Sequence, residues 1–154
     1  MFPNDGLMPL FLANFALFSP LLVFLSYLCP KNERMKILIT GASGFIGSFI
    51  VEEALKQGME TWAAVRRSSS RQYLQDGRIH FIELDLSSPA DLERRLAGMQ
   101  FDYVVHAAGA TKCLHEEDFY RVNTEGTKNL VHALLKVQMP LKRFVYLSSL
   151  SVFG

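Results

Sequence analysis

Three regularly spaced glycines are the feature of this sequence with the clearest chemical meaning. They lie in the segment Thr40-Gly41-Ala42-Ser43-Gly44-Phe45-Ile46-Gly47, which follows an apolar run and precedes residues with helical periodicity. A turn that leads into a helix presents backbone N–H groups without intrahelical partners and the positive end of the helix dipole, and both bind phosphate. We expect Gly41 to permit the turn, Gly44 to admit a diphosphate and Gly47 to let the helix pack on the strand. The segment therefore predicts a dinucleotide-binding loop.

The residues after the second apolar run indicate which dinucleotide this loop would hold. In such folds an acidic side chain at this strand end accepts a hydrogen bond from the adenosine ribose 2′-hydroxyl, whereas an arginine accommodates a 2′-phosphate. This chain has Val65-Arg66-Arg67-Ser68 and no carboxylate there. A guanidinium is planar, always charged and suited to phosphate. The alternative is a solvated arginine pair, but the missing acid and the present base both favour NADP over NAD, with Arg66 as the contact.

A metal centre is not expected from the histidines and cysteines. His106 ends a predicted strand, Cys113 and His115 lie in the loop after it, and a fourth ligand is absent. The two cysteines, Cys29 and Cys113, lie far apart in the sequence. They indicate no disulfide framework and favour a reducing compartment.

Short strands and helices alternate from Met35 onward and must position these groups. This alternation predicts βαβ units and an α/β fold, a Rossmann-type doubly wound parallel sheet that is incomplete at its C-terminal side. The expected strands are Lys36–Thr40, Glu60–Val65, Ile79–Leu84, Asp102–His106 and Arg143–Leu147. One helix should follow the glycine loop and stop at Gly58, a second should start at Ser88-Pro89, and a third should run from about Asp118 to Val137. The expected buried face of the third helix comprises Phe119, Val122, Leu130, Val131, Leu134 and Leu135. Gly126 in its middle predicts a close approach to the sheet or a ligand.

The glycine loop, with its G-x-x-G-x-x-G spacing, closely resembles that of the extended short-chain dehydrogenase/reductase family, also called the NAD-dependent epimerase/dehydratase family. Four further segments match that family in the right order, and the resemblance covers residues 35–154. These segments are Asp85-Leu86, His106-Ala107-Ala108-Gly109, Asn123-Thr124-Glu125-Gly126-Thr127 and Ser148-Ser149-Leu150-Ser151-Val152-Phe153-Gly154. Related flavonoid and cinnamoyl-type reductases carry their phosphate-binding arginine where this chain has Arg66. The motifs and this arginine together imply cofactor contacts from Gly41, Ser43, Gly44, Phe45, Ile46, Gly47, Arg66, Asp85, Leu86, Ala107, Ala108, Gly109, Asn123 and Ser148. From the residues alone, Asp85 could instead merely cap the turn after its strand.

The same resemblance implies a catalytic role for one serine. Ser149 matches the residue that holds the substrate oxygen, while the family's acid/base is the tyrosine of a Tyr-x-x-x-Lys motif. No such motif occurs in residues 35–154. We therefore expect a chain truncated before the catalytic tyrosine and the substrate region, which binds nucleotide weakly and does not turn over.

The implied function is that of an NAD(P)-dependent epimerase, dehydratase or reductase, present as its cofactor-binding part. Members of the family act on a secondary alcohol or ketone, here a nucleotide sugar or a dihydroflavonol-like substrate. The alternative is a non-catalytic NAD(P)-sensing regulator of the same fold. Substrate specificity depends on regions outside the matched motifs, so the sequence leaves it open.

Residues 1–34 form an apolar extension that the resemblance does not cover. Leu7–Leu28 carries no charge and is long enough to span a bilayer, although Pro9 and Pro20 interrupt it. Basic residues follow it, which would keep the domain cytoplasmic. A secretory signal fits less well, because Asp5 and no basic residue precedes the run. A leader that is not native to the protein is the interpretation we prefer, and a membrane anchor is the alternative.

The overall charge also bears on partners and location. The chain of 154 residues has 16 basic and 15 acidic side chains and a net charge of +1, which gives no reason to expect nucleic acid as a partner. We expect a small-molecule substrate, with a homodimer of the full-length protein left open. The expected location is cytoplasmic, with an inner-membrane anchor bearing a cytoplasmic domain as the alternative.

Overall fold

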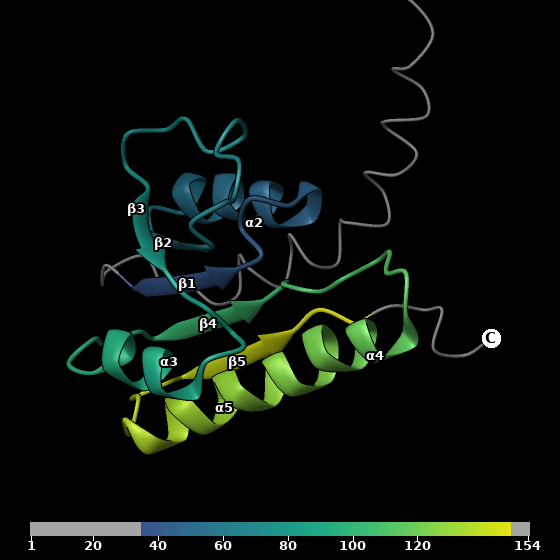
Figure 1. Ribbon diagram of the computed structural model, residues 1–154. Helices are drawn as coiled ribbons and strands as arrows, with labels where there is room; N and C mark the ends of the chain where they lie inside the picture. Colours follow the sequence, from purple (N-terminus) through teal and green to yellow (C-terminus); the bar gives the residue numbers. More distant parts are fainter. Residues whose placement is uncertain (1–34, 149–154) are drawn as a thin grey trace, which may run out of the picture. The chain divides into compact units, whose positions relative to one another are not determined.

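A five-stranded parallel sheet organises residues 35–148, the part of the chain that the computed structural model describes (Figure 1). Its strand order is β3-β2-β1-β4-β5. The strands are β1 (Lys36–Thr40), β2 (Glu60–Val65), β3 (His80–Glu83), β4 (Tyr103–His106) and β5 (Arg143–Tyr146). The chain first builds outward from β1 to β3 and then continues on the other side with β4. This reversal makes the carboxyl ends of β1 and β4 the switch point at which such sheets bind ligands. The predicted Rossmann-type α/β fold is confirmed.

Helices cover both faces of the sheet, as the doubly wound arrangement requires (Figure 1). Helix α2 (Phe45–Lys56) lies on one face. On the other face lie α3 (Pro89–Leu96), α4 (Glu116–Phe119), the π-helical segment η1 (Tyr120–Glu125) and α5 (Gly126–Lys136).

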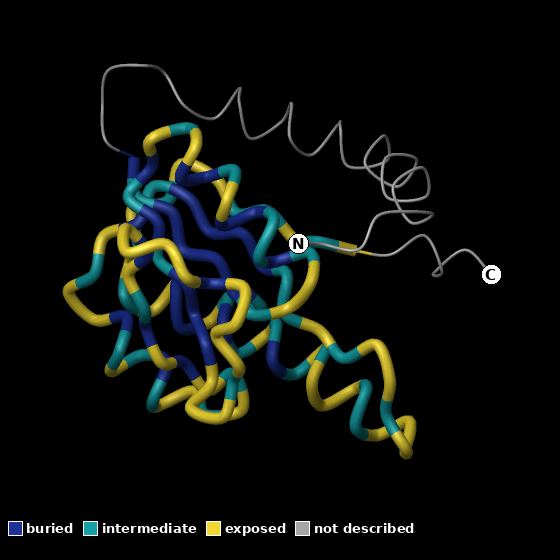
Figure 2. The backbone as a smooth tube through the Cα atoms, turned by 90° about the horizontal axis from the view of Figure 1, so that it is seen from above, coloured by how far each residue is buried: buried dark blue, intermediate teal, exposed yellow. Residues whose placement is uncertain are grey.

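The core lies between the central strands and these helices, and Figure 2 shows the strands as the most deeply buried part of the backbone. Leu38 of β1 and Val104 of β4 are fully buried, because neighbours pack on both faces of a central parallel strand. On the face covered by α3 and α5, the strands pack against apolar stripes of the two helices. These stripes are formed by Leu92, Leu96, Leu130, Ala133 and Leu134.

Local signals in the sequence placed the first two helices and the strands correctly. Helix α3 begins as expected, with Pro89 in its first turn and the Ser88 hydroxyl accepting from the backbone N–H of Asp91 at 3.4 Å. Gly58 after α2 has a φ of +76°, as a glycine stop requires. The strand bounds agree with the prediction to within one residue.

The expected third helix is the main correction to the predicted elements. It starts at Glu116 and is divided by the π-helical turn of η1, so its buried face does not run straight along its length. Leu130 and Leu134 are buried as predicted, and Phe119 and Val131 are half-buried. The predicted burial is wrong for Val122 and Leu135, which are 37% and 70% exposed. Leu135 lies about 100° round the helix from Leu134 and so faces away from the sheet.

Gly126, at the start of α5, is buried and lies against Leu86. A Cβ atom there would lie 3.4 Å from the Cβ atom of Leu86, which follows β3. This is an ordinary van der Waals contact with a side chain, so the expected close approach of the backbone to the sheet or a ligand stays a prediction.

Several sequence predictions fall outside the described residues. These are the segment Leu7–Leu28 with the rest of residues 1–34, and Ser149 with the residues after it. Within residues 35–148, no helix combines the length and apolar character needed to cross a membrane.

Candidate nucleotide-binding cleft

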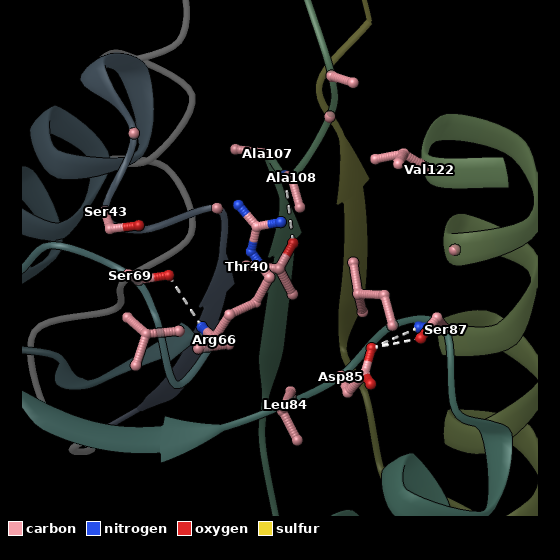
Figure 3. Close-up of a pocket in the computed structure, with 18 of the residues that line it drawn as sticks. Thr40, Ser43, Arg66, Ser69, Leu84, Asp85, Ser87, Ala107, Ala108 and Val122 are labelled. Carbon is pink, nitrogen blue, oxygen red and sulfur yellow. Dashed lines mark hydrogen bonds between the residues drawn. The ribbon is translucent and has the colours of Figure 1, made fainter. Parts of the chain in front are cut away.

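A cleft of about 570 Å³ opens at the carboxyl ends of the strands, at the switch point of the sheet. It is lined by the glycine loop after β1, the turn after β2, the residues after β3 and β4, and part of η1 and α5 (Figure 3). Nine of the residues predicted to contact a cofactor line it: Gly41, Ser43, Gly44, Arg66, Asp85, Leu86, Ala107, Ala108 and Gly109. Topology alone brings these five segments together.

The other predicted residues are not among those that line the cleft. Phe45 is 60% exposed and packs edge-on against Phe49, with ring centroids 5.1 Å apart. Ile46 is half-buried and Gly47 is buried in the first turn of α2. Ser148 is exposed at the end of the described chain. Their contacts with a cofactor stay predictions.

The glycine loop owes its shape to the missing side chains. Gly41 has a φ of +69°, and a Cβ atom there would lie 2.6 Å from the backbone carbonyl of Ala107. A Cβ atom on Gly47 would lie 2.0 Å from the carbonyl oxygen of Gly41. The expected turn at Gly41 and the expected close packing at Gly47 are thus confirmed. Gly44 is exposed on the cleft wall and donates its backbone N–H to the Gly41 oxygen at 2.9 Å, and its diphosphate contact stays a prediction.

Arg66 lies in a tight turn immediately after β2. Its backbone N–H donates to the Ser69 hydroxyl at 3.0 Å, and the Ser69 N–H donates to the Arg66 carbonyl at 2.9 Å. The exposed Arg66 side chain points into the cleft, and Ser69 lines the cleft beside it (Figure 3). Ser69 was not predicted as a cleft residue, although a serine four residues after a strand end is a recognisable turn signal.

Asp85 caps the turn after β3, which is the alternative role that the sequence left open. Its Oδ1 atom accepts from the Ser87 backbone N–H at 2.9 Å and from the Ser87 hydroxyl at 2.7 Å. The carboxylate therefore holds the turn after β3 while also lining the cleft. Leu86 is fixed next to it, because its carbonyl accepts from the Asn129 side-chain amide at 2.9 Å.

The segment after β4 is held by a histidine and an asparagine. His106 is fully buried, with Nδ1 at 2.6 Å from the Thr40 hydroxyl and Nε2 at 2.8 Å from the Thr127 hydroxyl. Burial lowers the pKa of His106 to about 4, because an apolar surrounding disfavours the charged imidazole. The Asn123 side chain accepts from the Ala110 backbone N–H at 2.7 Å and donates to the Ala110 carbonyl at 3.1 Å. Asn123 thus clamps the segment, and its predicted contact with a cofactor remains untested.

Three basic side chains surround the cleft, which the even overall charge did not reveal. Lys112 and Arg121 line it together with Arg66. Arg121 also pairs with Asp118 at 2.6 Å. An excess of positive charge around a cleft with exposed backbone N–H groups suits an anionic ligand.

The histidines and cysteines form no metal centre within the described part of the chain. No group of three or more potential ligands is gathered there. Both ring nitrogens of His106 are engaged by threonine hydroxyls, and His115 is exposed.

Comparisons with known proteins agree with this architecture. The NAD dependent epimerase/dehydratase family matches residues 37–154. UDP-glucose 4-epimerase 3 from Oryza sativa subsp. japonica is 31% identical over 139 residues, which cover 80% of this chain and 37% of that protein. The dTDP-6-deoxy-L-talose 4-dehydrogenase (NAD(P)(+)) from Kitasatospora kifunensis is 29% identical over 125 residues, which cover 81% of this chain and 38% of that protein.

A solved structure gives the same result for the fold. The Bordetella bronchiseptica enzyme WbmH in complex with NAD+ is 29% identical and superimposes with a TM-score of 0.67, covering 79% of this chain and 42% of that one. The chain therefore spans about two fifths of the length of the relatives it matches, 37% and 38% for the two enzymes above.

Proposed function

This chain belongs to the NAD-dependent epimerase/dehydratase family, and from that membership we propose that its cleft binds a nicotinamide dinucleotide with the diphosphate on the glycine loop. The observation that carries the proposal is the cleft itself, which opens at the sheet's switch point and is lined by Gly41 and Gly44. A side chain at either position would crowd the backbone that shapes this wall of the cleft, since a Cβ atom on Gly41 would overlap Ala107 and one on Gly44 would lie 3.2 Å from the Gly41 oxygen. The residues present fit the group.

The chemistry of the whole enzyme would be oxidation or reduction of a secondary alcohol or ketone. A bound nicotinamide supplies the hydride acceptor or donor. The residues of this chain would bind and orient the dinucleotide, and Ser149, by its motif, would donate a hydrogen bond to the substrate oxygen. A nucleotide sugar or a dihydroflavonol-like ketone is the proposed substrate class, supported by relatives such as the rice UDP-glucose 4-epimerase.

Nucleotide titration tests the proposal directly. Calorimetric titration of the 154-residue chain with NADP+ and NAD+ should show saturable binding of at least one of them. A matched titration with ribose 5-phosphate, which has no diphosphate bridge, should show none. Absence of binding by both dinucleotides would contradict the proposal. Binding by a full-length protein that turns over no alcohol or ketone would instead favour the sensing regulator.

NADP is the form of the cofactor that we propose, because of Arg66. Changing Arg66→Asp should weaken NADP+ binding by roughly tenfold to a hundredfold, the range expected for a lost charge-assisted hydrogen bond. NAD+ binding should change by less than about threefold, since NAD+ places no phosphate at this position. Titration of both nucleotides into both proteins measures the difference.

Arg67→Asp provides the matched control for this experiment. Arg67 is the next residue and is exposed, but it does not line the cleft. Because both variants replace an arginine with an aspartate, they change the total charge of the protein equally. Arg67→Asp should lower the affinity for NADP+ and for NAD+ only slightly and by equal factors. Equal losses for NADP+ and NAD+ in the Arg66 variant would show that the guanidinium does not recognise a 2′-phosphate.

A further inference from the structure

A directed chain of hydrogen bonds runs beneath the cleft from α5 to the backbone after β4. The register of the sheet places Thr40 of β1 beside His106 of β4, so that their side chains meet at the ends of the two strands. His106 also lies against Thr127 of α5. None of the polar groups in this cluster is needed by the chemistry described above.

Proton positions in the chain follow from a single carbonyl group. The Thr127 hydroxyl lies 2.6 Å from the carbonyl oxygen of Asn123, and a carbonyl can only accept, so the hydroxyl proton lies between them. Thr127 must then accept from His106, which places a proton on Nε2. In a neutral imidazole the other nitrogen, Nδ1, is an acceptor and receives the proton of the Thr40 hydroxyl.

The far end of the chain reaches the wall of the cleft. With its proton directed to His106, the Thr40 oxygen is free to accept, and the Ala108 backbone N–H lies 3.4 Å from it. Ala107 and Ala108 pack directly on Gly41, where a Cβ atom would lie 2.6 Å from either residue's backbone. The chain of hydrogen bonds therefore links Thr127 of α5 to the backbone that packs on the glycine loop.

We propose that His106 is a positioning residue for nucleotide binding: as a neutral imidazole protonated on Nε2, it transmits hydrogen-bond direction from Thr127 to Thr40 and thereby holds Ala108 against the glycine loop. This inference rests on the proposed function only for its effect on nucleotide affinity. With the imidazole proton on Nδ1, Nε2 could only accept, and the single proton of the Thr127 hydroxyl could not serve both Nε2 and the Asn123 carbonyl. Full burial of the ring keeps water from relieving that conflict.

The tautomer can be measured without any nucleotide. Nitrogen-15 NMR of the His106 ring in the 154-residue chain at neutral pH should show Nε2 protonated and Nδ1 bare. A proton on Nδ1, whether in the other neutral tautomer or in a charged ring, would overturn the proposal.

Thr127 allows the transmission to be tested from a residue that does not line the cleft. Thr127→Val removes the acceptor for Nε2–H, so amide exchange at Ala108 should accelerate by about tenfold and NADP+ or NAD+ affinity should fall by about tenfold, the usual effect of one lost hydrogen bond. Thr127→Ser keeps the hydroxyl and should restore both quantities to within about threefold of the original. If Thr127 acted only by filling space with its methyl group, Thr127→Ser would not restore the slow amide exchange at Ala108.

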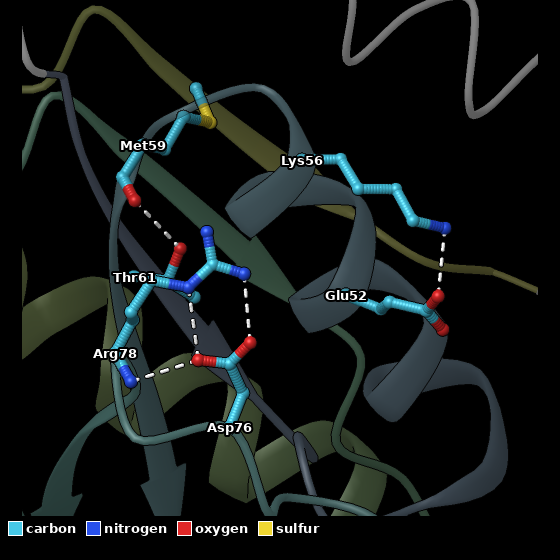
Figure 4. A network of polar contacts seen from close by, with 6 residues as sticks. All are labelled: Glu52, Lys56, Met59, Thr61, Asp76 and Arg78. Carbon is cyan, nitrogen blue, oxygen red and sulfur yellow. Dashed lines mark hydrogen bonds and ion pairs between the residues drawn. The ribbon is translucent and has the colours of Figure 1, made fainter.

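Thr61→Val is the matched control. Thr61 is fully buried whereas Thr127 is half-buried, and the Thr61 hydroxyl donates to the Met59 carbonyl at 3.1 Å, outside the chain of hydrogen bonds (Figure 4). It should lower global stability without a selective effect on Ala108 or on the nucleotide. If Thr127→Val and Thr61→Val change Ala108 exchange and nucleotide affinity to the same extent, the proposed role of His106 is contradicted even when nucleotide binds. If the original chain binds neither dinucleotide, the proposed function fails, while the tautomer and Ala108 exchange still decide the positioning role.

Discussion

Gly47→Ala is expected to destabilise the domain by at least about 3 kcal/mol, at the upper end of what overpacking costs. The added Cβ atom would lie 2.0 Å from the Gly41 oxygen, 2.7 Å from the Gly41 carbonyl carbon and 2.9 Å from the Ala42 Cα atom. All three are backbone atoms, so no side-chain rotation can relieve the overlap. Relief would require α2 to move away from the turn that joins it to β1, and nucleotide binding should be lost with it. Denaturant unfolding followed by circular dichroism measures the loss of stability.

Gly58→Ala separates this steric effect from the ordinary cost of replacing a glycine. Gly58 has a φ of +76°, but a Cβ atom there would meet nothing within 4 Å. Its replacement should cost about 1 kcal/mol, the price of the left-handed backbone conformation alone, and should leave nucleotide affinity unchanged. A loss at Gly47 no larger than that at Gly58 would mean that the turn and α2 are not packed as described.

Lowering the pH from about 7 to about 4 should reduce the free energy of unfolding by about 3 kcal/mol through His106 alone. Burial lowers the pKa of His106 from 6.5 to about 4 in the folded protein, and the unfolded chain has the ordinary value. Between these two values the unfolded state binds more protons than the folded state, so stability falls as the pH falls. The stabilisation is complete above the unfolded pKa and is lost as the pH drops through this window. Below the folded pKa both states are protonated and the loss stops.

His106→Asn gives the comparison that isolates this histidine. An asparagine can still accept a hydrogen bond from Thr40, and it does not titrate. Denaturant unfolding of both proteins across this pH range should show a clear slope for the original chain and a flatter one for the variant. Carboxylates contribute equally to both curves, including Asp76, whose pKa is lowered to about 2 by the Arg78 guanidinium (Figure 4). Parallel curves would show that His106 is not held neutral by burial, although Phe144 and Tyr146 pack beside it.

Features that depend on neighbouring residues could be predicted from the sequence. The turn at Gly41, the start of α3 at Pro89 and the bounds of β2 follow from backbone preferences and apolar periodicity, which act over a few residues. Alternation of strands and helices then leaves few topologies, and the parallel sheet is the one observed. The sequence also placed much of the cleft wall, because the glycine loop and the ends of parallel strands meet at one edge of the sheet.

Tertiary structure alone decided how distant polar groups are used. Thr40 and Thr127 are far apart in the sequence, and only the sheet register and the position of α5 bring both to His106. Lys112 and Arg121 likewise reach the cleft because of how the chain folds back after β4. The π-helical turn that contains the exposed Val122 was not predicted, since such turns are rare and the apolar periodicity of the sequence follows a regular helix. Composition and spacing record which groups a chain carries, whereas the charge, tautomer and reach of each group depend on burial and on partners from other elements.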